Sequence, residues 1–429
     1  MASSRSGRLE DLRDPVTITL DGAPLLAERG EPIAAALIAA GKMVIARSPK
    51  FHRPRGPACM RAACDGCLAR VDETPNIMTC MVAAEEGTAV VSQNRLGPRE
   101  VDLLRMTDWF FPEGMNHHEL FAGVPGVQSV MQAFARRVAG LGRMPLEIEA
   151  PHASARRSAD VVVVGGGPSG LAVAAALAKA GRSVEVLDDQ LVPGGGLLAL
   201  ARGDRRPFAE MHASFTDSVA AGRVRMRSGT IAGGMYGRDV LVVGPDGAEV
   251  VEARALVFAS GAHDGALAFE GNDVPGVMSA RAGGLLLGRN VLPGKKIVIV
   301  VAEGGGPFGE SFARGVPGER ASVTVVRGEP VAVRGASRAK AVIVRDGAGT
   351  EKEYAADVVL VDAPRSPAYE LAEQAGAPLV HEPRGFVVRT EAGRFGDGLY
   401  AAGELTGVPF EARAIAEDAA RVAASIIAG

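Results

Sequence analysis

CMRAACDGCLARVDETPNIMTC, residues 59–80, contains every cysteine of this 429-residue chain. The spacing is Cys59-x4-Cys64-x2-Cys67-x12-Cys80. Because four unrelated thiols would scatter along so long a chain, this grouping predicts one shared site with four thiolate ligands. A structural zinc site is the alternative, but zinc sites with four cysteines usually have two Cys-x2-Cys pairs, and only one such pair is present here.

The spacing is typical of plant-type [2Fe-2S] ferredoxins, in which three ligands share a tight loop and the fourth follows farther along. Soft anionic thiolates suit iron and sulfide. Gly66 in the loop permits backbone conformations with positive φ, which a chain curling around inorganic sulfide requires. The sequence therefore predicts an electron-carrying [2Fe-2S] centre, with Cys59, Cys64, Cys67 and Cys80 as its ligands.

The sequence before the cysteines indicates how this region folds. Residues 16–20 alternate as a strand, Asp21-Gly22 is a hairpin turn, and residues 23–27 can return as a second strand. An apolar helix is predicted over 32–40, with Gly41 closing it. Strand, hairpin and helix ahead of a cysteine loop predict a β-grasp ferredoxin-like domain with α+β character.

Composition limits the remaining possibilities. The chain is 47% hydrophobic and has 55 Gly and one Trp, which allows two or three domains with full cores. Lys and Arg total 47 and Asp and Glu total 50, so the net charge of −3 indicates neither a nucleic-acid surface nor a polybasic membrane patch. We find no signal-peptide pattern and no run of about 18 apolar residues. A cytoplasmic location, where thiols stay reduced, is expected.

A complete βαβ dinucleotide-binding unit is predicted in the middle of the chain. An apolar strand at 161–164 leads into Gly165-x-Gly167-x-x-Gly170, followed by an Ala-rich helix over 171–180 and a second strand at 183–187. Gly165 permits the sharp turn, Gly167 lets the backbone approach a pyrophosphate, and Gly170 packs helix on strand. The helix N-terminus favours phosphate. Asp188 ends the second strand, where it can accept a hydrogen bond from a ribose hydroxyl.

Two later segments resemble flavoproteins of the glutathione-reductase kind. A strand at 255–260 runs into Gly261, and another at 399–402 runs into Gly403-Glu404. These look like the ATG-type crossover and the late glycine-acid motif that closes over a flavin ribityl chain. Ser260 stands where the superfamily has Thr, and Glu404 stands where it usually has Asp.

A second, degraded dinucleotide motif is predicted between those segments. The strand at 296–301 is followed by Gly304-x-Gly306-x-x-Gly309, but Ala302-Glu303 intervene and Pro317 cuts the next helix short. Arg327 occupies the place of the ribose acid, which suits the 2′-phosphate of NADP. An exposed arginine in a domain that has lost its ligand is the alternative.

Several short segments resemble the α subunit of multimeric sarcosine oxidases. They are also similar to related subunits of hydrogen cyanide synthase, opine oxidase and hydroxyproline or proline dehydrogenases, from about residue 13 to the end of the chain. The segments are FHRPRG (51–56), VSQNR (91–95), AGLGR (139–143), DDQ (188–190), PGGGLL (193–198), GAH (261–263) and GNDVPGV (271–277). Sarcosine oxidase α subunits usually lack the cluster cysteines and continue into a folate-binding domain. We therefore do not expect folate-dependent capture of formaldehyde on this polypeptide.

The resemblance implies an electron-transfer subunit of a multicomponent amine or amino-acid oxidase or dehydrogenase, in a hetero-oligomer. A FAD-dependent β subunit of the amine-oxidase type would oxidise the small-molecule amine or imino acid. This chain would carry [2Fe-2S] and FAD, with NAD or ATP as alternatives in the first dinucleotide site and FMN possible at a subunit interface. Its predicted nucleotide-binding residues are Gly165, Gly167, Pro168, Ser169, Gly170, Asp188, Asp189, Gln190, Gly195, Gly196, Ser260, Gly261, Gly403 and Glu404.

No catalytic residue is predicted. The polar candidates nearest the motifs have structural or surface alternatives, and Arg53 and Arg55 could offset cluster charge or grip a flavin phosphate. The histidines concerned are His52, His117, His118 and His263. Trp109-Phe110-Phe111 predicts docking of one domain on another, with an exposed partner site as the alternative.

The predicted architecture is an α/β fold in which the β-grasp [2Fe-2S] domain precedes a glutathione-reductase-like fold with two dinucleotide-binding domains. Its parts are a flexible tail (1–14), the β-grasp domain (15–105), a helical connector (106–157) with a helix at 127–139, the first Rossmann-like domain (158–280 and 365–429), which ends in a helix over 411–427, and an inserted degenerate domain (281–364).

Two other functions stay open. A self-contained NAD(P)H-dependent reductase would pass electrons through flavin and cluster to an oxygenase, and it would need an intact second nucleotide domain. A non-catalytic scaffold would keep NAD or ATP as a structural ligand, an alternative that Glu404 leaves open.

Overall fold

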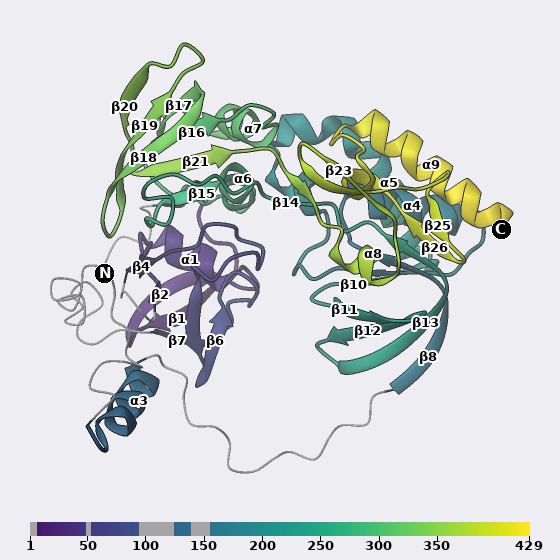
Figure 1. Cartoon of the computed structure of the whole chain (residues 1–429), viewed down its shortest axis with the longest axis horizontal. Coiled ribbons are helices and arrows are strands. Elements are labelled where there is room, and N and C mark those ends of the chain that lie inside the picture. The colour runs from purple at the N-terminus through teal and green to yellow at the C-terminus, as the bar shows by residue number, and fades with distance from the viewer. Residues whose placement is uncertain (1–6, 49–52, 94–123, 139–154) are drawn as a thin grey trace. The chain divides into compact units, whose positions relative to one another are not determined.

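The computed structural model describes residues 7–48, 53–93, 124–138 and 155–429 (Figure 1). Predictions that concern His52, His117, His118 and Trp109-Phe110-Phe111 lie outside these residues. The chain divides into two compact units. The first comprises 1–149, 267–303 and 316–361, and the second comprises 150–266, 304–315 and 362–429.

The first unit begins with the predicted β-grasp arrangement. Its sheet has the order β2-β1-β7-β5-β6, in which β1 and β2 form an antiparallel hairpin and β7 lies parallel to β1. Asp21 and Gly22 both have positive φ, as a tight two-residue turn requires. Every residue of α1 is buried. The elements are β1 (Pro15–Leu20), β2 (Ala23–Glu28), α1 (Ile33–Ala39), β3 (Ala46–Arg47), β4 (Pro54–Arg55), β5 (Leu68–Val71), β6 (Thr74–Met78), β7 (Ala89–Ser92) and α3 (Val127–Val138).

The rest of the first unit contains a parallel sheet and an antiparallel sheet. The parallel sheet has the order β15-β21-β16-β17, and the antiparallel sheet has the order β18-β19-β20. Their elements are β15 (Val277–Ser279), α6 (Ala280–Leu287), β16 (Lys296–Val301), β17 (Ser322–Arg327), β18 (Glu329–Gly335), β19 (Ala339–Arg345), β20 (Glu351–Ala355) and β21 (Val358–Asp362). Arg327 ends β17 and pairs in register with Val301 of β16.

The second unit is built on a mixed sheet with the order β10-β9-β8-β13-β12-β11, to which β26 and β25 are attached. The strands are β8 (Ala155–Val164), β9 (Val184–Leu187), β10 (Val224–Arg227), β11 (Ile231–Tyr236), β12 (Asp239–Gly244), β13 (Gly247–Phe258), β25 (Arg394–Gly396) and β26 (Leu399–Ala401). The shorter strands are β14 (Ala262–His263), β22 (Ser366–Pro367), β23 (Leu379–Glu382) and β24 (Gly385–Val388). The helices are α4 (Pro168–Lys179), α5 (Ala209–Ala220), α7 (Phe308–Gly315), α8 (Glu370–Gln374) and α9 (Ala412–Ala428), with short 3-10 turns at Gly195–Ala199, Arg202–Phe208 and Gly403–Thr406.

Strand β8 has apolar residues on both faces of the sheet. Val161 and Val163 lie in the core that includes Leu171 of α4 and Val422 of α9, whereas Val162 lies in the opposite core with Phe258. Both faces are covered, which explains why the strand reads as an unbroken apolar run. The predicted strand at 161–164 is only the end of β8, and the predicted strand at 255–260 covers the end of β13 and two residues beyond it; the two strands pair from Ala155 and Glu249 onward.

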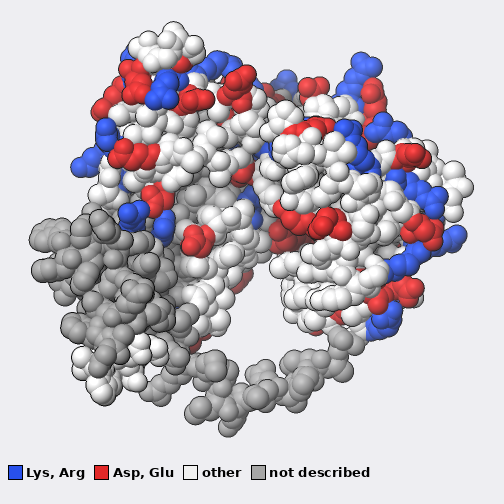
Figure 2. All heavy atoms as spheres, viewed as in Figure 1, with Lys and Arg blue, Asp and Glu red and all other residues white. Residues whose placement is uncertain are grey.

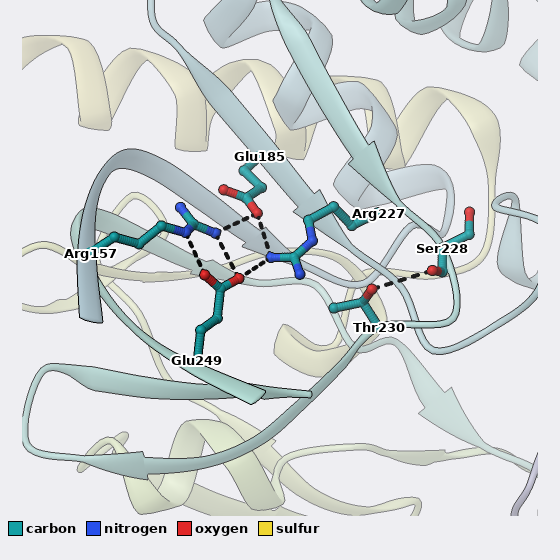
Figure 3. Close-up of polar contacts among 6 residues, drawn as sticks. All are labelled: Arg157, Glu185, Arg227, Ser228, Thr230 and Glu249. Atoms are coloured by element: carbon teal, nitrogen blue, oxygen red, sulfur yellow. Dashed lines mark hydrogen bonds and ion pairs between the residues drawn. The ribbon is translucent and has the colours of Figure 1, made fainter. Parts of the chain in front are cut away.

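Four charged residues tie the strands of this sheet together (Figure 3). Arg157 on β8 donates to Glu249 on β13 and to Glu185 on β9, each at 2.7 Å. Arg227 on β10 also donates to both carboxylates. Hydrogen bonds from Arg157, and then from Arg227, lower the pKa of Glu249 to about 2. The network joins residues up to 92 positions apart in the chain.

Charges are mixed over the face of the molecule shown in Figure 2, where Lys and Arg alternate with Asp and Glu. Within the described residues, no helix has the length and apolar character that crossing a membrane requires.

Candidate cluster loop and dinucleotide site

Three of the four cysteines lie in the loop between β4 and β5, and Cys80, which follows β6, joins them in the first unit. Cys59, Cys67 and Cys80 are buried, and Cys64 is partly exposed. The backbone N–H of Ala63 donates to Cys59 Sγ at 3.2 Å, and that of Ala62 donates to Cys80 Sγ at 3.4 Å. N–H groups aimed at sulfur stabilise thiolates, and they lower the charge cost of reducing a bound cluster.

The loop can curl this tightly only because of its local conformation. Met60 and Ala62 have positive φ values of 56° and 61°. A side chain on Gly66 would place its Cβ 2.0 Å from the carbonyl oxygen of Gly56. The sequence predicted that Gly66 is needed for a positive φ. Gly66 has no positive φ; glycine is required there because the backbone of Gly56 lies too close for a side chain.

The sulfurs are close enough to share protons. Cys64, and then Cys80, donate hydrogen bonds that lower the pKa of Cys59. Contact with Cys59 correspondingly raises the pKa values of Cys64 and Cys80. Four sulfurs linked through the pairs Cys59–Cys64, Cys59–Cys80 and Cys67–Cys80, with backbone donors around them, fit an iron–sulfur cluster, in which metal would replace the shared protons.

The cluster loop also contacts a later part of the first unit. Arg55 donates to Asp273 at 2.8 Å, and the N–H of Ser279 donates to the carbonyl of Ala58 at 2.9 Å. A Cβ on Gly56 would lie 3.2 Å from Pro275. Arg55 is thus engaged by a carboxylate of the chain itself, and the loop is attached to the 273–279 segment.

In the second unit, the first glycine motif has the geometry that its residues predict. Gly165 has a φ of 108°, and a Cβ there would lie 2.3 Å from the carbonyl oxygen of Ala259. A Cβ on Gly170 would lie 1.9 Å from the carbonyl oxygen of Gly165. Around Gly167, by contrast, a Cβ would meet no atom within 4 Å among the described residues. The backbone is therefore open at the position where a pyrophosphate is expected.

Asp188 holds this loop in place. Its side chain is 6% exposed and accepts hydrogen bonds from the N–H of Gly166 and, at 2.9 Å, from that of Gln190. A contact with a ribose hydroxyl remains a prediction. Asp189 is exposed and accepts a hydrogen bond from the side chain of Gln190 at 3.0 Å.

The 194–196 turn lies directly against the same loop. The N–H of Gly194 donates to the carbonyl of Gly166 at 2.7 Å. A Cβ on Gly195 would lie 3.0 Å from Cα of Gly167 and 3.9 Å from Cδ of Pro168. The predicted nucleotide-binding residues at 165–170 and 195–196 are thus neighbours.

The late motif closes the same site from the other side. Gly403 has positive φ, its N–H donates to Asp418 at 2.8 Å, and a Cβ there would lie 2.2 Å from Ser169 Oγ. A Cβ on Gly261 would lie 3.9 Å from Glu404 Oε2. Ser260 donates instead to the carbonyl of Ala368 at 2.7 Å, so its hydroxyl supports the loop.

Arg365 is a residue of this site that sequence reasoning missed. Its Nη2 forms an ion pair with Glu404 Oε1 at 2.9 Å, and its guanidinium lies over the rings of Phe308 and Phe410, at 4.8 Å and 5.1 Å from the ring centroids. Its Nη1 is buried and has no hydrogen-bond partner among the described residues. A buried N–H group of this kind suits an oxygen atom of a ligand. Arg365 belongs to no motif, so only the fold reveals it.

His263 is placed at the surface. It lies 3.0 Å from Glu370, and both side chains are about half exposed, which fits the surface alternative.

Comparison with known proteins identifies both sites by class. Residues 13–95 match the family model of a 2Fe-2S iron-sulfur cluster binding domain, and residues 163–213 match that of an NAD(P)-binding Rossmann-like domain. L-proline dehydrogenase from P. horikoshii has the same fold, with a TM-score of 0.72 and 21% identity over 99% of this chain and 75% of that one. A cluster domain and a dinucleotide domain on one chain define an oxidoreductase.

Curated relatives identify the group more closely. Sarcosine oxidase subunit alpha of Rhizobium meliloti (strain 1021) is 32% identical over 314 residues, which are 67% of this chain and 32% of the relative. The subunit alpha of Corynebacterium sp. (strain U-96) is 27% identical over 70% of this chain and 29% of the relative. The chain spans about a third of the length of these relatives. The predicted resemblance to sarcosine oxidase α subunits is thereby confirmed.

Proposed function

We propose that this chain is the electron-transfer α-like subunit of a multicomponent oxidase or dehydrogenase for a secondary amine, amino acid or imino acid. The observation that carries the proposal is the combination, on one chain, of four converging cysteines with a dinucleotide site assembled from several separate segments. Similarity to sarcosine oxidase α subunits supports the amine class of substrate. The same proposal includes a cytoplasmic location and the domain boundaries predicted from the sequence, with the β-grasp domain at 15–105, the connector at 106–157, the first Rossmann-like domain at 158–280 and 365–429, and the inserted domain at 281–364.

The cysteine loop is proposed to hold a [2Fe-2S] cluster, which supplies one-electron transfer when bound. Cys59, Cys64, Cys67 and Cys80 would be the ligands. The N–H groups of Ala62 and Ala63 would balance the negative charge of the sulfurs. Because Cys64 is the partly exposed member of the set, electrons would enter or leave on its side of the loop.

The first dinucleotide site is proposed to hold FAD, with NAD or ATP as alternatives, and FMN would lie at an interface with the partner. Gly167 would admit the pyrophosphate to the backbone. Asp188 holds the turn around it. Arg365 offers Nη1 to an oxygen of the ligand while Nη2 stays on Glu404. The buried Nη1, which has no partner within the described part of the chain, favours a ligand oxygen at Arg365.

The partner is proposed to be a FAD-dependent β subunit of the amine-oxidase type, in a hetero-oligomer. On that proposal the isolated chain does not oxidise sarcosine, proline, hydroxyproline or opines. The test is anaerobic mixing of this chain with a co-purified partner and substrate. Substrate-dependent bleaching of the cluster absorbance is expected only with all three components present. If the isolated chain turned over an amine with an artificial acceptor at about 10 per second, a typical enzyme rate, the proposal would be wrong.

A further inference from the structure

In the second glycine motif, backbone N–H groups are already bound by a carboxylate of the chain itself. The carboxylate of Asp362, at the end of β21, accepts a hydrogen bond from the N–H of Gly309 at 2.6 Å and another from the N–H of Gly306. Asp362 is 3% exposed. These are the second and third glycines of Gly304-x-Gly306-x-x-Gly309. In a working dinucleotide fold, N–H groups of this loop and helix start face the pyrophosphate.

The loop also lacks one donor that a phosphate could use. Pro307 has no N–H, and it stands between the two glycines that Asp362 engages. The following helix, α7, has eight residues and ends at Gly315. A nucleotide would therefore have to compete with Asp362 for the same N–H groups.

Asp362 is also held firmly in position. The strand before it is buried along its whole length. After it, Pro364 packs closely against two glycines: a Cβ on Gly304 would lie 3.3 Å from Pro364 Cγ, and a Cβ on Gly265 would lie 2.1 Å from the carbonyl oxygen of Pro364. Burial raises the pKa of Asp362, while the hydrogen bonds from Gly309 and Gly306 and the charge of Arg365 oppose this shift and favour the carboxylate. A carboxylate fixed on both sides cannot move aside without opening this packed segment.

We propose that Asp362 fills the phosphate position of the second glycine motif, so that this motif binds no NADH or NADPH. The inference goes beyond the proposed function, because it concerns a different motif and stands whatever the first site or the cluster holds. It removes the entry point for electrons that a self-contained NAD(P)H-dependent reductase would need.

Hydrogen–deuterium exchange of the peptide covering residues 303–312 tests this locally, on the full-length protein as purified with its first-site nucleotide. Millimolar NADPH or NADH should leave the exchange of that peptide unchanged in the wild type. In Asp362→Ala the amides of Gly306 and Gly309 lose their acceptor, and their exchange should become about tenfold faster. Inorganic pyrophosphate should then slow the exchange in Asp362→Ala and have no effect in the wild type.

Two further variants distinguish blocking of the loop N–H groups by Asp362 from a general destabilisation of the segment. Asp362→Asn keeps an acceptor and fills the same space, so it should show little faster exchange and no response to pyrophosphate. Asp357→Ala is the matched control, since Asp357 also accepts backbone N–H groups, from Lys295 and Lys296, but none from the glycine loop. It should leave the 303–312 peptide unchanged. Protection of this peptide by NADPH in the wild type would overturn the proposal, and so would a folded Asp362→Ala that pyrophosphate does not protect.

Discussion

Arg365 and Glu404 form a largely buried ion pair at 2.9 Å, with side chains 13% and 14% exposed. They come from different loops, one after β21 and one after β26. Glu404 belongs to the late glycine-acid motif, and its carboxylate is paired with the Arg365 guanidinium of the same chain. The ion pair therefore holds Arg365 beside the late motif of the first dinucleotide site. The Nη1 group of Arg365 still has no partner among the described residues.

Breaking this pair should destabilise the second unit more than removing both charges. Arg365→Met leaves the Glu404 carboxylate buried without its cation, and we expect a loss of about 3 kcal/mol in the free energy of unfolding. Arg365→Met combined with Glu404→Gln should recover most of it. Urea unfolding of the two single variants and the double variant measures the coupling. Additive losses would show that the pair contributes nothing of its own.

Gly167 and Gly170 should respond differently to the same small substitution. Gly167→Ala adds a methyl group to open space, so the protein should fold normally but retain less nucleotide. Gly170→Ala forces the methyl group against the carbonyl of Gly165 and should lower the melting temperature by several degrees, on the order of 2 kcal/mol of strain. Calorimetry and chromatography of released nucleotide measure both. Full nucleotide content in Gly167→Val would place the ligand elsewhere.

Cys64→Ser should remove the cluster. We expect the wild type to contain about two irons and two acid-labile sulfides per chain, and the variant almost none. Ala63→Ser changes an exposed neighbour in the same loop and should keep both. Metal and sulfide analysis with electron paramagnetic resonance of the reduced protein gives the answer. Stoichiometric zinc without labile sulfide would contradict the [2Fe-2S] assignment.

The ion network of the second unit should make stability depend on pH in the acid range. The pKa of Glu249 is lowered from 4.5 to about 2 on folding, so its contribution is complete above pH 4.5 and is lost as the pH falls toward 2. Glu249→Gln should reduce stability at pH 7 and flatten the dependence below pH 4.5. Glu252→Gln, on the same strand but half exposed and 3.8 Å from Arg156, is the control. Identical pH profiles of unfolding for wild type and Glu249→Gln would refute this role.

Local sequence predicted much of this chain correctly. The Asp21-Gly22 turn, the strand at 296–301 and the end of α7 before Pro317 are where the residues indicated, because turn glycines, apolar runs and prolines act over a few neighbouring residues. The first glycine motif likewise reads as a βαβ unit, since Gly165 and Gly170 are required by the backbone around them. The lengths of β8 and β13 were underestimated, because the residues that extend them, such as Arg156 and Arg157 in β8, are partly polar and exposed and do not read as part of an apolar run.

What the sequence determined by itself was the identity of the four cysteines and of the first dinucleotide motif, since each chemistry is written in a short spacing. Tertiary structure alone decided which distant side chains meet the first dinucleotide site and the second glycine motif. Arg365 meets Glu404, and Asp362 meets Gly309, across 39 and 53 residues of chain, from positions with no motif or period to mark them. Such pairs form because packed strands bring distant loops together, and the need to satisfy buried charges and N–H groups then selects the partners.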